Sequence, residues 1–174
     1  MFAKVNGVNL FYEKSGSGPP LLLLHGNSED HRVFDKIVVK LANHFTVYAL
    51  DSREQGASEK TGQFSYALMA EDVYAFVVDL GLGQVNLAGF SDGAIVGLLL
   101  GLSRPQILKK MILMGPNLKP GDLTDEAVAF LRELEAQGDY PLFRVIFKEP
   151  DIELSSLKNV KVPCLVVAGE NDLF

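Results

Sequence analysis

The stretch VNLAGFSDGAIVGLLLG, residues 85–101, sets a serine between two glycines with an apolar run on either side. The segment Gly89-Phe90-Ser91-Asp92-Gly93 matches G-x-S-x-G, a pattern that holds a nucleophilic serine on a sharp turn between a strand and a helix. Glycines two residues before and two residues after the serine relieve the crowding of such a turn. The helix N-terminus behind the serine favours developing negative charge. The stretch therefore predicts a nucleophile elbow at Ser91, with Asp92 in the first turn of the helix.

Short apolar runs alternate with helical patterns around this stretch. Strands are expected at residues 21–24, 45–50, 85–90, 110–115 and 162–169, and helices at residues 31–41 and 66–80. The strand runs are continuously apolar, which is typical of strands buried on both faces. The alternation predicts an α/β fold, a mostly parallel twisted sheet with helices on both faces, preceded by an N-terminal β-hairpin at Asn6-Gly7. In such sheets ligands bind beyond the carboxyl ends of the strands.

The length of 174 residues and the 48% apolar content suit one domain, residues 1–174. Within it, residues 117–161 are expected to form a small helical lid-like insertion, whose main helix is capped by Thr124 and ended by Gly138. Its apolar side chains, Phe130 and Leu131 among them, either roof a pocket or pack the insertion onto the sheet.

Composition excludes several classes of protein. The net charge of −6 without a basic stripe predicts no nucleic-acid partner, and the apolar runs are too short for a membrane span. The glycines Gly81 and Gly83 precede a strand, whereas a dinucleotide-binding fingerprint follows one. No metal-ligand spacing occurs, so neither metal nor other cofactor is expected. A soluble cytoplasmic protein is predicted, with its one cysteine, Cys164, as a small buried apolar residue.

Four segments together resemble the α/β-hydrolase family. They are LLLLHGN (21–27), ALDSREQGAS (49–58), the elbow, and LSSLKNVKVPCLVVAGEND (154–172). The second segment departs from the family pattern at Glu54, where a glycine is usual. The resemblance implies that the backbone N–H groups of Asn27 and Asp92 form the oxyanion hole, and that Asp172 is the triad acid. Asn117 and Asp122 fit the acid pattern less well.

The residue that would take the proton of Ser91 is missing. The family order is serine, acid, histidine, but His25, His31 and His44 all precede Ser91. The resemblance assigns His25 to the shape of the oxyanion loop. His25 and Phe90 are also the candidate substrate contacts, whereas His31 and His44 are expected to face solvent. The chain is therefore expected to lack the triad histidine, to be truncated, and to be weakly active or inactive.

Two functions remain open at this point. The first is a serine hydrolase that acts on an ester or related acyl bond of a small molecule. The alternative is a non-catalytic binding or interaction protein that retains the hydrolase scaffold. A serine at the elbow leaves esterases, lipases, peptidases, C–C bond hydrolases and acyltransferases open. In either case residues 162–169 would form an apolar edge strand, which we expect to pair with a second copy of the chain or to cause aggregation.

Overall fold

One seven-stranded sheet organises the computed structural model, which describes residues 1–137, 142–170 and 172. The order of its strands is β1-β2-β4-β3-β5-β6-β7. The strands are β1 (Phe2–Val5), β2 (Val8–Ser15), β3 (Pro20–Leu24), β4 (Thr46–Leu50), β5 (Val85–Phe90), β6 (Leu108–Met114) and β7 (Cys164–Val167). β1, β2 and β4 pair antiparallel, and β4, β3, β5, β6 and β7 pair parallel. The expected fold class, a mostly parallel sheet with an N-terminal hairpin, is confirmed.

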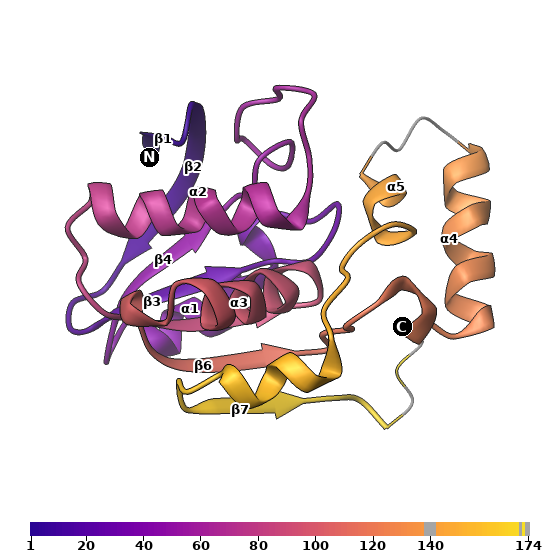
Figure 1. Cartoon of the computed structure of the whole chain (residues 1–174). Helices are drawn as coiled ribbons and strands as arrows, with labels where there is room; N and C mark the ends of the chain where they lie inside the picture. Colours follow the sequence, from indigo (N-terminus) through magenta and orange to yellow (C-terminus); the bar gives the residue numbers. More distant parts are fainter. Residues whose placement is uncertain (138–141, 171, 173–174) are drawn as a thin grey trace.

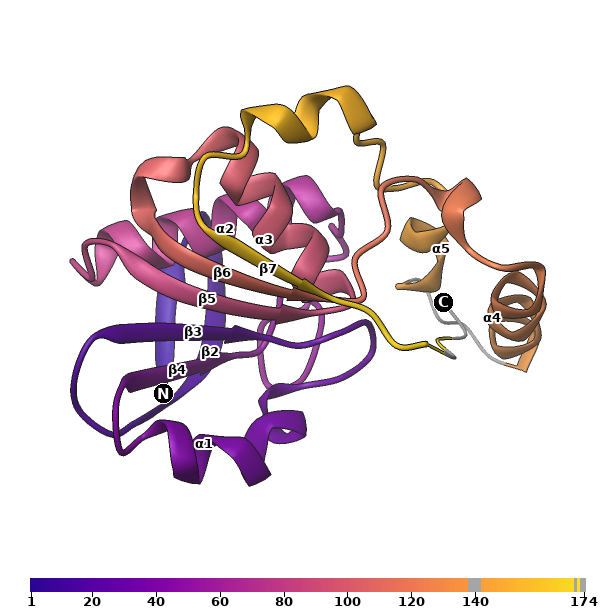
Figure 2. The ribbon, with the colours of Figure 1, turned by 90° about the horizontal axis from the view of Figure 1, so that it is seen from below.

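Helices lie on both faces of this sheet (Figures 1 and 2). α2 and α3 cover one face, and α1 with the short helix η1 covers part of the other. The helices are η1 (His31–Phe34), α1 (Asp35–Leu41), α2 (Tyr66–Asp79), α3 (Asp92–Ser103), η2 (Pro105–Ile107), η3 (Pro120–Asp122), α4 (Asp125–Gln137), α5 (Phe143–Ile146) and η4 (Leu154–Asn159). Among the described residues, no helix combines the length and the apolar character that crossing a bilayer requires.

The central strand β3 is buried on both faces, as its continuous apolar sequence predicts. Leu22 and Leu24 join the core beneath α2 and α3, whereas Leu23 joins the smaller core beneath α1. All three side chains are at most 2% exposed. β3 is hydrogen-bonded in parallel to β5, so the loops that follow these two strands leave the same edge of the sheet.

Residues 51–58 form a loop held by buried polar side chains. Arg53 donates from Nε and from Nη2 to the carboxylate of Asp72 on α2, both at 2.6 Å. Glu54, which stands where the family pattern has glycine, adopts a positive φ of 66°. Its carboxylate compensates for this unfavourable backbone conformation by accepting hydrogen bonds from Thr61 Oγ1 at 2.8 Å and from the Gly62 N–H at 2.9 Å.

The insertion between β6 and β7 places α4 and α5 beyond the carboxyl ends of the strands (Figure 1). Thr124 Oγ1 accepts from the Ala127 N–H at 3.0 Å, which is the expected cap at the start of α4. The expected end of this helix, Gly138, lies outside the described residues. That residues 117–161 act as a lid stays a prediction.

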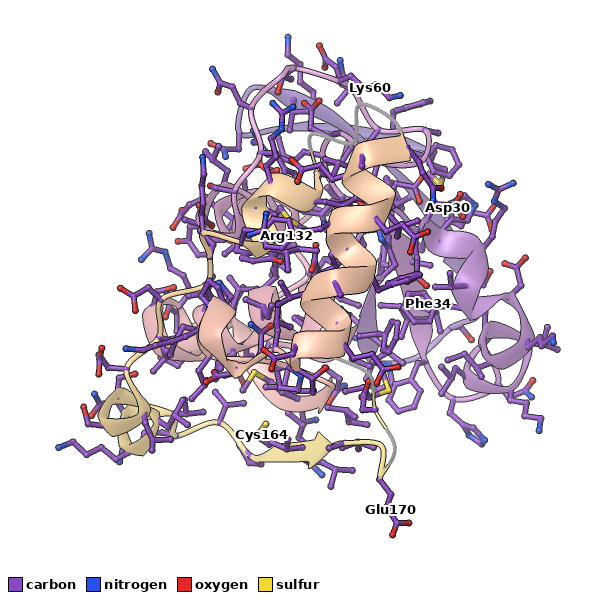
Figure 3. The ribbon with its side chains drawn as sticks, turned by 90° about the vertical axis from the view of Figure 1, so that its right-hand side faces the viewer. Asp30, Phe34, Lys60, Arg132, Cys164 and Glu170 are labelled. Carbon is purple, nitrogen blue, oxygen red and sulfur yellow. The ribbon has the colours of Figure 1, made fainter. Side chains whose placement is uncertain are left out.

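Two expectations are wrong. Residues 31–41 are expected to form one helix, but η1 and α1 divide the segment, and its apolar residue Ile37 is 46% exposed. Cys164 is also exposed, because it lies on β7 at the rim of the sheet (Figure 3). Periodicity alone does not show whether a neighbouring element covers an apolar side chain.

β7 forms an apolar edge of the sheet. It pairs with β6 on one side, and Leu165, Val166 and Val167 are 42–61% exposed. An apolar groove of about 620 Å³ continues from Leu165 past Ile112 of β6 toward α1. Exposed edges of this kind act as templates for pairing with other chains.

We predict that the 174-residue chain self-associates through β7. A lysine in the middle of the edge would oppose pairing by charge repulsion and by desolvation, so Leu165→Lys should shift the protein toward monomer in size-exclusion chromatography with light scattering. Val78→Lys is the matched control, because Val78 is an exposed apolar residue of α2, which covers the face of the sheet opposite to α1 and the groove. A wild-type chain that stays monomeric at high concentration would contradict the prediction.

Candidate active site

Ser91 occupies a strained turn between β5 and α3. Its φ of 51° and ψ of −117° lie where non-glycine residues cost of order 1–3 kcal/mol. The turn is so tight that a Cβ atom at Gly89 would lie 2.2 Å from the carbonyl oxygen of Gly93. A Cβ atom at Gly93 would lie 2.2 Å from the carbonyl oxygen of Leu24 at the end of β3. Both glycines of the elbow pattern are therefore required by backbone packing.

Two of the three backbone N–H groups of residues 91–93 donate hydrogen bonds to carbonyl groups of other segments. The Ser91 N–H donates to the Met114 carbonyl at 2.8 Å, and the Gly93 N–H donates to the His25 carbonyl at 3.1 Å. The N–H of Asp92, between them, has no hydrogen-bond partner within the described part of the chain. It is the first amide of α3, where the helix dipole favours a negative ligand.

The loop after β3 repeats this arrangement. The Gly26 N–H donates to Glu29 Oε2 at 2.8 Å, and the Ser28 N–H donates to Gln55 Oε1 at 2.6 Å. Among the residues that the structure describes, the intervening N–H of Asn27 has no partner. The bond from Gly93 to His25 joins this loop to the elbow, so the two free amides belong to adjoining backbone segments.

A pocket of about 700 Å³ opens beside Ser91 at the carboxyl ends of the strands. The loops after β3, β5, β6 and β7 contribute to its wall, and α4 and α5 supply an apolar side. Its lining includes the predicted site residues Asn27, Phe90, Ser91, Asp92 and Asp172, and also Asn117 and Asp122. The lining residues Gly26 and Asp172 are 146 positions apart in the sequence, and they meet in one pocket because neighbouring parallel strands end at the same edge of the sheet.

Asp172 reaches this pocket from the segment after β7. A Cβ atom at Gly115, directly after β6, would lie 3.6 Å from Asp172 Oδ2. The Gly115 N–H donates to the Val167 carbonyl at 2.9 Å, which continues the β6–β7 pairing to the pocket. The aspartate therefore stands over the end of the strand next to the one that carries Ser91.

The structure does not bring His25 to the pocket wall. Its ring is fully buried, with Nδ1 2.7 Å from the Gly26 carbonyl and with Nε2 accepting from the Ser52 N–H at 3.0 Å. These bonds fix the neutral ring with its proton on Nδ1. Burial lowers the pKa of His25 below its usual range, and hydrogen bonding to Gly26 opposes that shift. His25 thus braces the loop after β3.

Neither of the other two histidines lines the pocket either. His44 is exposed, as expected. The expectation that His31 faces solvent is wrong, because its Nδ1 lies 2.7 Å from Asp51 Oδ1 and its side chain is only 13% exposed. No histidine therefore supplies a base to Ser91 in this structure, and all three lie within the described residues.

Asp30, His31 and Asp51 form the only group of three potential metal ligands among the described residues. Both carboxylate oxygens of Asp51 already accept hydrogen bonds within the protein. Asp51 Oδ1 accepts from the backbone N–H of His31, and Asp51 Oδ2 accepts from the backbone N–H of Ala57. Asp30 is bound by Arg32, whose guanidinium holds the pKa of that carboxyl at about 2. These bonds explain the cluster without a metal ion.

Sequence reasoning placed Asp92 at the helix N-terminus but missed the role of its side chain. The carboxylate is 2% exposed, and it accepts from the Tyr66 hydroxyl at 2.8 Å and from Asn27 Nδ2 at 2.9 Å. Burial raises the pKa of Asp92 to about 6, and these two hydrogen bonds limit the rise. Asn27 Nδ2 also donates to the Leu142 carbonyl at 3.2 Å, so one amide links the elbow, the loop after β3 and the insertion.

The chain belongs to the α/β-hydrolase family, because the family model for the alpha/beta hydrolase fold matches residues 19–172. It is 34% identical over 134 residues to a soluble epoxide hydrolase of Corynebacterium sp. strain C12, covering 74% of this chain and 46% of that protein. It is 29% identical over 138 residues to the uncharacterized hydrolase YraK of Bacillus subtilis, covering 76% and 51%. The chain therefore spans about half the length of these relatives.

Solved structures share the fold at lower identity. An N-formylmaleamic acid deformylase from Pseudomonas putida S16 superposes with a TM-score of 0.80 at 20% identity, covering 97% of this chain and 81% of that one. The enol-lactonase of Burkholderia xenovorans LB400 superposes with a TM-score of 0.75 at 23% identity, covering 99% and 82%.

The raised pKa of Asp92 predicts a pH-dependent stability. Below about pH 4 the carboxyl is protonated in both states and its contribution to the free energy of unfolding is fully present. As the pH rises from about 4 to about 6 the unfolded state ionises first, so this contribution, roughly 3 kcal/mol, is lost. Asp92→Asn should abolish this decline in urea unfolding between pH 4 and pH 7.

The control for this measurement is Asp79→Asn, at an exposed aspartate that ends α2. It should keep the wild-type decline. Parallel stability profiles of wild type and Asp92→Asn would mean that Asp92 titrates as an ordinary carboxyl.

Proposed function

We propose that the chain carries the nucleophile, the oxyanion hole and the acid of a serine hydrolase that cleaves an ester or related acyl bond. The observation that supports this most strongly is the position of Ser91, strained on its turn beside two N–H groups without partners. Strain at a residue of this kind is typical of functional sites. Free amides are typical of oxyanion holes.

In the proposed reaction Ser91 Oγ attacks the acyl carbonyl and forms a tetrahedral intermediate. The backbone N–H groups of Asn27 and Asp92 donate to its oxyanion, and each such donor contributes about 10²–10³ to the rate of hydrolases of this type. Collapse of the intermediate releases the alcohol and leaves an acyl ester on Ser91. Water then attacks this ester at the same place and frees the acid.

Asp172 is proposed as the acid that orients an imidazole and stabilises its charged form. Asp172 lines the pocket together with Ser91, but none of the three histidines does. Without an imidazole, the Ser91 hydroxyl is a weak nucleophile. We therefore expect acylation of the 174-residue chain to be slow, near the floor of about 10³–10⁴-fold over water left by an oxyanion hole and binding alone.

The proposed substrate is a small molecule with an apolar part. Seven pocket residues of the insertion are apolar: Leu118, Leu123, Phe130, Leu131, Leu134, Phe143 and Ile146. A deformylase and an enol-lactonase among the fold neighbours support acyl-bond chemistry on this scaffold. We also propose a cytoplasmic location, on the basis of the composition and the single cysteine.

We predict that hydrolysis of p-nitrophenyl butyrate by the chain depends on Ser91 and rises when free imidazole is added as a diffusible base. Ser91→Ala should lose the serine-dependent rate and the imidazole response, and its residual rate gives the background of imidazole alone. Ser103→Ala, at an exposed serine that ends α3, should behave as wild type.

Mass spectrometry of a fluorophosphonate adduct tests the same assignment directly. Slow labelling confined to Ser91 is expected. If labelling and hydrolysis persist unchanged in Ser91→Ala, the proposed function is wrong. Rapid stoichiometric labelling without imidazole would instead refute the expectation of slow acylation.

A further inference from the structure

The charges around the pocket are all of one sign. Its described lining contains five carboxyl side chains and no lysine, arginine or histidine. The carboxyls belong to Glu29, Asp92, Asp122, Glu170 and Asp172. Three of them belong to other parts of the wall. Asp122 lies on η3, Asp172 lies over the end of β6, and Glu170 points away from the molecule (Figure 3).

The remaining two carboxylates flank the serine. The point at which a Cβ atom of Gly26 would lie is 2.9 Å from Glu29 Oε2 and 3.2 Å from Ser91 Cβ, so both groups face the same small space. Asp92 follows Ser91 directly and is also a lining residue of the pocket, and its carboxylate is buried. Within the described residues, neither Glu29 nor Asp92 forms a salt bridge, and Glu29 Oε1 has no hydrogen-bond partner.

Two carboxylates that form no salt bridge, next to an oxyanion hole, oppose the reaction proposed above. They disfavour the negative charge that develops on the substrate oxygen, and they repel a substrate that is itself an anion. A cation in the substrate would offset both carboxylates in a partly enclosed space, where charge interactions are stronger than in water.

We infer that this pocket selects substrates that join an ammonium group to an apolar body, and that Glu29 and Asp92 determine this selectivity. The apolar body would lie against α4 and α5, and the ammonium group would lie near Glu29 and Asp92. The inference rests on the proposed function for the position of the reacting bond, but the selectivity itself is a property of binding.

Three ligands of one skeleton test the inference: 3-phenylpropylammonium, 3-phenylpropanol and 3-phenylpropanoate. Their dissociation constants would be measured by titration calorimetry at pH 7.5 on the Ser91→Ala chain, which keeps the pocket but not the nucleophile. We expect the ammonium ligand to bind at least tenfold more tightly than the carboxylate ligand, with the alcohol between them.

Glu29→Gln and Asp92→Asn, each added to Ser91→Ala, should lower this preference several-fold, and the two together should nearly abolish it. Glu29→Gln keeps an oxygen that can accept from the Gly26 N–H. In Asp92→Asn the one remaining oxygen can accept from Asn27 Nδ2, and the new amide can donate to the oxygen of the Tyr66 hydroxyl. Glu126→Gln, at an exposed carboxylate in the first turn of α4, should leave the preference unchanged. Near-native circular dichroism and melting temperature would show that the variants are folded.

Equal, reversed or undetectable binding of the three ligands would overturn the inference, as would a preference that persists in the double variant. The outcome is separable from that of the proposed function. Loss of Ser91-dependent hydrolysis with the ammonium preference intact refutes only the proposed reaction. Ser91-dependent hydrolysis without the preference refutes only the selectivity.

Discussion

The site depends on one close contact, in which the backbone at the start of α3 packs directly onto the ends of β3 and β5. Side chains at Gly89 or Gly93 would overlap carbonyl oxygens at 2.2 Å, so the contact exists only because both positions lack a Cβ atom. It allows the Gly93 N–H to donate to the His25 carbonyl, which fixes the elbow against the loop after β3. The strain at Ser91 is sustained by this packing, and the two free amides are positioned by it.

The parallel sheet extends this local arrangement into a pocket. β3 and β4 are buried on both faces, and the parallel strands deliver their following loops to one edge, where the insertion adds an apolar wall. The same packing buries the Asp92 carboxylate next to the place where negative charge would develop. Active sites commonly retain such unfavourable features where a ligand compensates for them, and a cationic ligand is the compensation that the charges here require.

Sequence reasoning succeeded where a pattern reports a backbone requirement. The elbow, the hairpin at Asn6-Gly7 and the burial of β3 and β4 follow from the spacing of glycines and from continuous apolar runs. The expected burial of β6 on both faces is wrong, because Ile112 is 40% exposed. Sequence reasoning failed where the outcome depends on contacts distant in sequence. The partners of Asp92 lie 26 and 65 positions away, and the pairing of His31 with Asp51 spans 20 positions.

The exposure of Cys164 depends on which elements lie beside β7, about which its apolar sequence carries no information. The sequence shows only that Glu29 is an acidic residue four positions after His25. Its carboxylate comes near Ser91 because the loop after β3 folds back over Gly26, which the sequence does not reveal.

The amides of Asn27 and Asp92 are together proposed to hold an oxyanion formed at Ser91. Amide ¹H–¹⁵N spectra of the chain with and without a saturating alkylboronic acid, which forms a tetrahedral adduct on an active serine, test this proposal most directly. We expect large downfield shifts of the Asn27 and Asp92 amide protons. We expect small changes at Ser28 and Gly93, whose amides already donate within the protein. A boronate adduct on Ser91 that leaves the Asn27 and Asp92 amides unshifted would show that these two amides do not form the oxyanion hole.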